Sequence, residues 1–72
     1  MPDNMRANIA TADALTLLLH NQHALGASIE EITCWISGSG ADNVADNAIA
    51  ALETLDRNAQ AISEAITRLR NS

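Results

Sequence analysis

The sequence of 72 residues is poor in the groups that usually stabilise very small proteins. It has a single cysteine, Cys34, so no internal disulfide can form, and its cysteine and histidines lack the spacing of a zinc finger. Below about 70–80 residues, one hydrophobic core rarely stabilises a chain by itself. Small chains then add disulfides, a metal or a second copy, so the sequence predicts oligomerisation.

Aromatic residues and proline are also nearly missing. Trp35 is the only aromatic residue, and the single proline, Pro2, lies outside every periodic segment, so no interior proline breaks a helix. Hydrophobic residues nevertheless make up 47% of the chain. A core of Leu, Ile, Val and Ala suits closely packed helices, because sheets favour β-branched and aromatic residues. We therefore expect an all-α fold.

Lysine is missing altogether. Nine acidic residues stand against four arginines, which gives a formal net charge of −5. Phosphate backbones and anionic membranes are bound mainly through Lys and Arg, so we expect no DNA and no membrane as partner. No run approaches the roughly 20 apolar residues of a membrane span, and Asp13 interrupts the only signal-peptide-like run, 9–19. The expected location is the cytoplasm.

Periodicity in the second half of the chain predicts a helix over about 43–70. Apolar residues recur in steps of three and four through four heptads, and polar residues occupy the opposite side. Small and large residues alternate along this stripe, which lets two helices approach closely. The stripe consists of Ala45, Ala48, Leu52, Leu55, Ala59, Ile62, Ile66 and Leu69.

The same periodicity predicts a helix over about 4–37 in the first half. Gly26 costs about 1 kcal/mol relative to alanine inside a helix, and residues 28–31 have the form of a capping box. A break into helices 4–25 and 29–37 is therefore the alternative, but the heptad phase continues through Gly26 and favours one helix, straight or kinked. Its stripe consists of Leu15, Leu18, Gln22, Leu25, Ile29, Ile32 and Ile36, widened by Ala14, Leu19 and Trp35.

Two serines and two glycines between the periodic segments predict a turn over about 38–42, with Ser39 or Asp42 capping the second helix. So short a link implies an antiparallel helical hairpin. Folding about Gly40 places Gln22 near Asn58. These two amides either form a polar layer that fixes the register or both point to solvent.

A single hairpin leaves part of each apolar stripe in water, and two hairpins close into a four-helix bundle. Arginines 6, 68 and 70 lie at the end with both termini, whereas the acidic residues 30, 31, 42 and 46 lie toward the turn. An antiparallel homodimer would place opposite charges side by side. The predicted interface between the copies consists of Leu15, Leu18, Gln22, Leu25, Ile29, Ile32, Ile36, Leu52, Leu55, Ala59, Ile62, Ile66 and Leu69.

Few residues suggest chemistry. His20 and His23 are neighbours on a helix, but a metal site needs three or four convergent ligands, so we interpret both as surface histidines. Cys34 has no base beside it in sequence, and we expect a small buried apolar residue. No phosphate loop, dinucleotide fingerprint, nucleophile elbow or calcium loop is present. We expect no catalytic residue, no metal and no cofactor, and therefore a protein that is not an enzyme.

The leading hypothesis is a small protein-interaction or regulatory module that works as a homodimeric acidic helical bundle, with itself and one further protein as partners. The first alternative is RNA binding through Arg6, Arg68 and Arg70. In architecture the expected dimer resembles the plasmid RNA-regulating helical hairpin dimers, a likeness of fold that assigns no residue a role. The second alternative is a metal or redox role through His20, His23 and Cys34.

Overall fold

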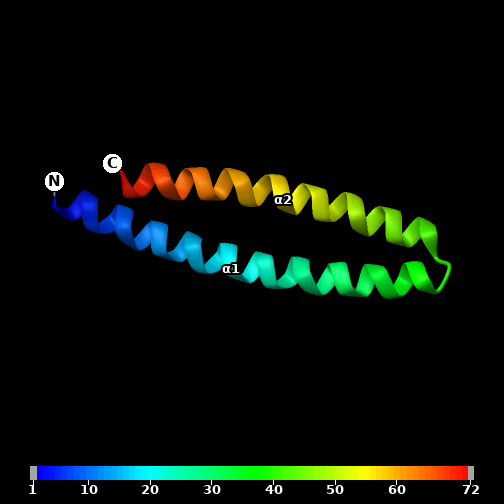
Figure 1. Cartoon of the computed structure of the whole chain (residues 1–72). Coiled ribbons are helices and arrows are strands. Elements are labelled where there is room, and N and C mark those ends of the chain that lie inside the picture. Colours follow the sequence, from blue (N-terminus) through cyan, green and yellow to red (C-terminus); the bar gives the residue numbers. More distant parts are fainter. Residues whose placement is uncertain (1, 72) are drawn as a thin grey trace.

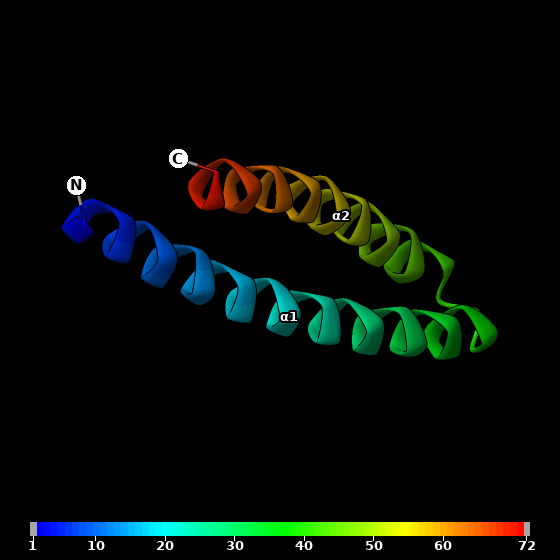
Figure 2. The same ribbon diagram turned by 60° about the vertical axis from the view of Figure 1, so that its left-hand side comes forward.

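A computed structural model of the chain consists of two long helices that pack side by side as an antiparallel hairpin (Figure 1). It describes residues 2–71, and the side chains of residues 4–71. Helix α1 spans Pro2–Gly38 and helix α2 spans Asp42–Arg70, so the ends lie within two residues of the predicted ones. The predicted hairpin is confirmed, and a second view shows the same side-by-side packing (Figure 2).

The hairpin is a rod. Its principal extents are 57 × 15 × 11 Å, and its radius of gyration is 16.6 Å. A compact domain of this length would have a radius of gyration of roughly 11 Å. The first helix runs without interruption through Gly26, so the alternative of a break after residue 25 is wrong. A partner helix along its length offsets the propensity cost of one glycine, as the unbroken heptad phase indicated.

The turn ends α1 through a Schellman motif. The N–H of Ala41 donates to the carbonyl of Ile36 at 3.3 Å, and the N–H of Gly40 donates to the carbonyl of Ser37 at 3.1 Å. This motif needs a left-handed residue, and Gly40 has φ +88°. The cap prediction is wrong, because Ala41 holds the N-cap position of α2 without a side-chain hydrogen bond. Ser39 Oγ donates to the carbonyl of Trp35 instead.

Helix α2 buries the predicted stripe against α1. Ala45 is buried, and the other stripe residues, from Ala48 to Leu69, are half-buried. The residues between them are mostly exposed. The three-four spacing therefore gave the correct side of this helix, because its apolar residues occupy a single narrow arc.

Helix α1 is turned by about 50° from its predicted orientation, given 3.6 residues per turn. One of its two predicted columns is correct, since Leu15, Gln22, Ile29 and Ile36 are half-buried. The other predicted column faces solvent: Leu18, Leu25 and Ile32 are 61%, 65% and 56% exposed. Small and polar side chains next to α2 let the two helices lie close together. The observed second column consists of Ala12, Leu19, Gly26 and Thr33.

Of the two alternatives for Gln22 and Asn58, the polar layer is not the one observed. Gln22 Nε2 donates to the backbone carbonyl of Leu55 at 2.8 Å, and Asn58 is exposed. Gly26, one turn after Gln22, lines the same hollow and has no side chain to fill it. The glutamine amide therefore reaches the backbone of α2 instead of a second amide.

Candidate functional site: two unlike faces of the hairpin

The hairpin has too little buried surface to form a closed core. Among the described side chains only Ala12, Leu19, Thr33 and Ala45 are buried. Large hydrophobic residues that are at least 47% exposed number nine. Their distribution over the surface therefore indicates where the molecule makes its contacts. They are Met5, Ile9, Leu17, Leu18, Leu25, Ile32, Trp35, Val44 and Ile49.

Cross-helix contacts define one broad face of the hairpin. Arg70 of α2 donates to Asp13 Oδ1 at 3.0 Å and to Thr16 Oγ1 at 3.4 Å, both on α1. Two hollows further along join the same side of α1 to α2. The helical repeat then assigns to this charged face residues Asp13, Thr16, His20, His23, Ala27, Glu30, Cys34 and Ser37 of α1, and Asp42, Asp46, Ile49, Glu53, Asp56, Gln60, Ser63, Thr67 and Arg70 of α2.

The two hollows of the charged face are small. One has a volume of about 240 Å³, and Gln22, His23, Gly26, Ala27, Glu30, Leu55 and Asp56 line it. The other has a volume of about 340 Å³, and Glu30, Thr33, Cys34, Ser37, Ile49 and Leu52 line it. Ligand pockets commonly have about 300–1,000 Å³ and enclose most of a bound molecule. These hollows are grooves between two helices, and we assign no reaction to them.

The opposite face carries almost no charge. Its residues recur at intervals of three and four along α1 and α2, on the side opposite the Arg70–Asp13 pair. Three described charged residues adjoin it: Arg68 at the end with the termini, Arg57, whose Nη2 donates to Thr54 Oγ1 at 3.3 Å, and Glu31, a helical neighbour of Ser28 and Trp35. This neutral face consists of Ala14, Leu18, Asn21, Leu25, Ser28, Ile32 and Trp35 of α1, and Val44, Asn47, Ala51, Thr54, Asn58, Ala61 and Ala65 of α2.

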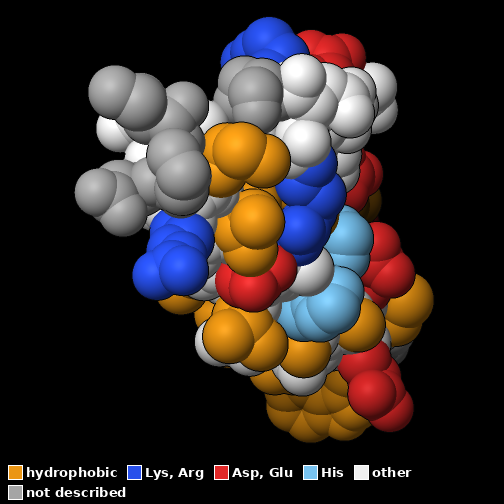
Figure 3. Space-filling model, turned by 90° about the vertical axis from the view of Figure 1, so that its left-hand side faces the viewer, with side chains coloured by type: hydrophobic (Ala, Val, Ile, Leu, Met, Phe, Trp, Pro, Cys, Tyr) orange, Lys and Arg blue, Asp and Glu red, His pale blue; other side chains and the backbone are white. Residues whose placement is uncertain are grey.

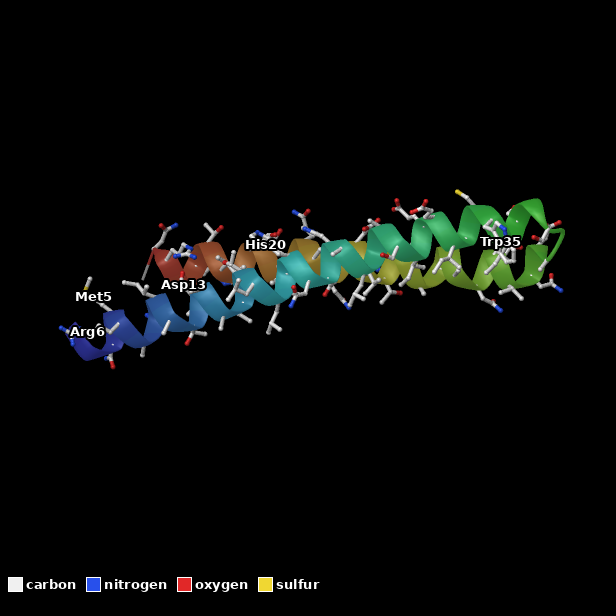
Figure 4. The ribbon with its side chains drawn as sticks, turned by 90° about the horizontal axis from the view of Figure 1, so that it is seen from below. Met5, Arg6, Asp13, His20 and Trp35 are labelled. Carbon is white, nitrogen blue, oxygen red and sulfur yellow. The ribbon has the colours of Figure 1, made fainter. Side chains whose placement is uncertain are left out.

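Large hydrophobic residues concentrate on the neutral face. Five of the nine exposed ones belong to it, and Trp35 is 73% exposed near the turn (Figure 4). Of the residues assigned to the charged face, Ile49 alone is among the nine. An exposed apolar surface on this scale is typical of a contact with another protein.

The hydroxyl groups of the neutral face already have hydrogen-bond partners. Ser28 Oγ donates to the carbonyl of Ala24 at 3.1 Å, and Thr54 Oγ1 donates to the carbonyl of Ala50 at 3.3 Å. A polar group that is bonded within its own helix loses little when water leaves its surface. Ser28 is therefore compatible with a dry contact across this face, whereas Thr54 Oγ1 also accepts from Arg57 Nη2 at 3.3 Å, so a guanidinium borders the face there.

The predicted metal candidates do not form a site. His20 and His23 are exposed, as interpreted from the sequence, and lie side by side among charged residues (Figure 3). His23 shares a hollow with Glu30 and Asp56. Among the side chains of residues 4–71, however, no group of three His, Cys, Asp or Glu has the arrangement to hold a metal ion.

Cys34 is exposed, so the expectation of a buried apolar cysteine is wrong. It lies one position beyond the observed contact column, beside Thr33, and lines the larger hollow. The 50° rotation of α1 moved the contact column, and the burial expected at Cys34 falls on Thr33 instead. The redox alternative stays a prediction that the geometry does not favour.

The three arginines proposed for RNA do not share one surface. Arg70 lies on the charged face, where Asp13 binds it, and Arg68 adjoins the neutral face. Arg6 lies near the start of α1 (Figure 4). An electrostatic footprint for a phosphate backbone needs a continuous basic stripe. The RNA alternative therefore gains no support from the arrangement.

The residues predicted as an oligomer interface fall into two groups in the single chain. Ten of the thirteen are half-buried within the hairpin, where the two helices contact each other. Three lie outside on the neutral face: Leu18, Leu25 and Ile32. The sequence prediction missed Val44 and the alanines beside it, which complete this face on α2. What identifies these residues is the lack of charged residues along that side of α2, because hydrophobicity alone does not single them out.

Comparison with known proteins adds no relative: no protein-family description, no curated protein and no solved structure matches the chain. Neither helix, over the residues that the structure describes, has a segment long and apolar enough to cross a membrane.

Proposed function

We propose that this protein is a small, non-enzymatic interaction module whose working unit is a self-associated four-helix bundle. The observation that carries the proposal is the imbalance between buried and exposed apolar side chains. Four described residues are buried, whereas nine large hydrophobic residues are exposed. A chain of this size rarely balances its conformational entropy with so little burial, and a second hairpin supplies the missing contacts.

The charged face is the surface that such a bundle would present to a client protein. It carries six carboxylates and one arginine, Arg70, which Asp13 already engages. Charges on a rigid helical surface raise association rates and select partners of opposite charge. A regulator, inhibitor or adaptor with a basic client fits this surface better than an enzyme, because its two hollows are small grooves.

Self-association is tested by sedimentation equilibrium over a wide range of concentrations. The expected particle has twice the 7.6 kDa mass of the chain. Its thermal midpoint should also rise with protein concentration, since unfolding of a dimer is coupled to dissociation. A monomer that stays fully helical at every concentration would contradict the proposal.

The client is tested by crosslinking in cells that express the chain at its native level, with a matched bait. The bait Asp46→Asn, Glu53→Gln, Asp56→Asn removes three exposed carboxylates of the charged face and keeps side-chain size. We expect a crosslinked protein that the unchanged chain captures and this bait does not. Equal capture by both baits, or capture by neither, would count against a client on the charged face.

A further inference from the structure

We infer that the neutral face binds the neutral face of a second copy of this chain, with the two hairpins running head to tail. This inference rests on the proposed self-association and goes beyond it, because it names the surface, the orientation and the register. The occupant is a second copy and not another protein or a lipid. Charge, area and side-chain size along the face support this choice.

The area of the face is suited to a stable pair. The two helices lie side by side from about Asp13 to Gly38, a length of about 39 Å at 1.5 Å per residue, and the hairpin is 15 Å wide, so the face has a footprint of about 600 Å². Two such faces bury about 1,200 Å² together, at the lower end of the range for a specific protein–protein interface. The charged face has the same dimensions, but burying it on itself would bring six carboxylates against six others.

The two ends of the rod carry opposite charges. Arg68 adjoins the neutral face at the end with the termini, whereas Glu31, toward the turn, is the helical neighbour of Ser28 and Trp35 of the same face. A parallel pair would place like charges beside each other at both ends. A head-to-tail pair places the basic end of one copy beside the acidic end of the other, which also satisfies two-fold symmetry.

The register follows from where α2 ends. Its last residue, Arg70, binds Asp13 of α1, so the paired part of α1 extends from about Asp13 to Gly38. Leu25 lies twelve residues from Asp13 and thirteen from Gly38, close to the middle. A two-fold axis there brings Leu25 onto its own copy and brings Leu18 opposite Ile32 of the second copy.

The same axis brings Trp35 level with Leu15 of the second copy, beside Ala14 on the neutral face. The indole is the largest side chain of the protein and is 73% exposed, and the neighbouring alanine leaves space for it. Large and small side chains that alternate across a contact pack without voids. The side-chain sizes near Trp35 and Ala14 are therefore compatible with the head-to-tail orientation.

The experiment is a charge exchange between the two positions that the register pairs. Leu18→Glu and Ile32→Arg, each alone, place an unpaired charge in the contact, and we expect each to weaken association by at least about tenfold. Mixing the two chains in equal amounts should restore both mass and helicity. The double variant Leu18→Glu/Ile32→Arg should associate with itself, because every introduced charge then meets its opposite.

Two substitutions serve as matched controls. Leu17→Glu changes the neighbouring leucine, which is 65% exposed and lies between the two faces. Ile49→Glu changes a residue of the charged face that is 47% exposed. Neither should weaken association by more than about twofold, because surface substitutions outside a contact have small effects. The register is tested by comparing the mass and helicity of the mixture with those of each single variant. The test therefore still works if a single variant does not fold by itself.

Each contrary result has a separate meaning. If the unchanged chain is monomeric, the proposed function fails together with this inference. If Ile49→Glu dissociates the pair and Leu18→Glu does not, self-association stands and the neutral face is the wrong surface. If the unchanged chain is dimeric, Leu18→Glu dissociates it and Ile32→Arg does not restore it, the neutral face stands and the head-to-tail register is wrong.

Discussion

The two helices of the hairpin use the same kinds of residue in different ways. Helix α2 places five of its seven large apolar residues against α1, and only Val44 and Ile49 are exposed. Helix α1 places Ala12, Gly26 and Thr33 next to α2, and carries Leu18, Leu25 and Ile32 on the outside. Its apolar arc is therefore wider than the contact with one neighbouring helix requires. Helix α1 therefore supplies four of the five large exposed side chains of the neutral face, and α2 supplies one, Val44.

This difference shows why the hairpin is an incomplete unit. A helix whose smaller side chains face its partner gains close approach but little buried area. The larger side chains then stabilise the fold only when a further surface covers them. If this interpretation is correct, substitutions along α1 should separate into those that weaken the hairpin and those that weaken its association.

The largest effect is expected within the run of three consecutive leucines on α1. Leu19 is 8% exposed against α2, whereas Leu18 and Leu17 are 61% and 65% exposed. Leu19→Ala should lower the free energy of unfolding by about 2–3 kcal/mol through a cavity. Leu18→Ala should cost about 1 kcal/mol, and only at concentrations where copies associate, while Leu17→Ala should stay within about 0.5 kcal/mol. Urea unfolding at two protein concentrations measures all three, and equal effects would remove the distinction between the two sides of α1.

Two glycines should respond in opposite directions to alanine. Gly40 has φ +88°, so Gly40→Ala should destabilise the turn by about 1 kcal/mol. At Gly26 an added Cβ meets nothing within 4 Å, so Gly26→Ala should stabilise the chain by about 1 kcal/mol. Thermal unfolding followed by circular dichroism compares them. A loss of stability in Gly26→Ala would show that α1 needs this gap for its approach to α2.

A smaller gain is expected from Thr33, the buried polar residue of α1. Its Oγ1 donates to the carbonyl of Ile29, at 2.6 Å, within the same helix. Thr33→Val removes this hydroxyl and leaves no buried donor unsatisfied, because the acceptor belongs to the helix backbone. We expect about 0.5–1 kcal/mol more stability from the apolar methyl group. Ser37→Ala, an exposed position on the same side, is the control, and a stabilisation of equal size there would point to helix propensity instead.

The smallest effect is expected at the charged face. The Arg70–Asp13 pair is 3.0 Å long, but its side chains are 44% and 62% exposed. Exposed ion pairs contribute little and are screened by salt, so Asp13→Asn should cost less than about 0.5 kcal/mol. Stability of both forms measured at low and high salt checks this, since the difference should vanish at high salt. A loss above 1 kcal/mol would mean that the pair determines how the ends of the two helices meet.

The sequence was sufficient to predict the hairpin and the orientation of α2. Its three-four spacing from Ala45 to Leu69 offers one narrow arc, so one rotation of the helix buries it. The rotation of α1 was predicted incorrectly, because hydrophobicity ranks Leu25 and Ile32 above Gly26 and Thr33 for a place in the contact. What decides this is how closely the two backbones approach, a property of both helices together and not of either sequence segment.

Residues of the two faces were harder to predict for the same reason. Cys34 and Trp35 follow Thr33 directly, so a rotation of 50° changes which of them is expected to be buried. The neutral face draws residues from two helices in opposite directions, and only their pairing brings Val44 to the side of Leu25. The segregation of charge becomes visible once Arg70 and Asp13 fix which sides of the two helices adjoin.

Trp35 has a consequence for how the molecule can be observed. As the only aromatic residue, it supplies all the indole absorption and fluorescence of the chain, and it reports from a single place near the turn. Because the indole is 73% exposed in a single hairpin, the fluorescence of the monomer should be shifted to longer wavelength and should be easily quenched by iodide. Melting the two helices apart would then change this signal little, whereas covering the turn end of the neutral face would shift it strongly. A titration of tryptophan fluorescence against protein concentration therefore reports contacts at the turn end of the neutral face and reports little about the contact between α1 and α2.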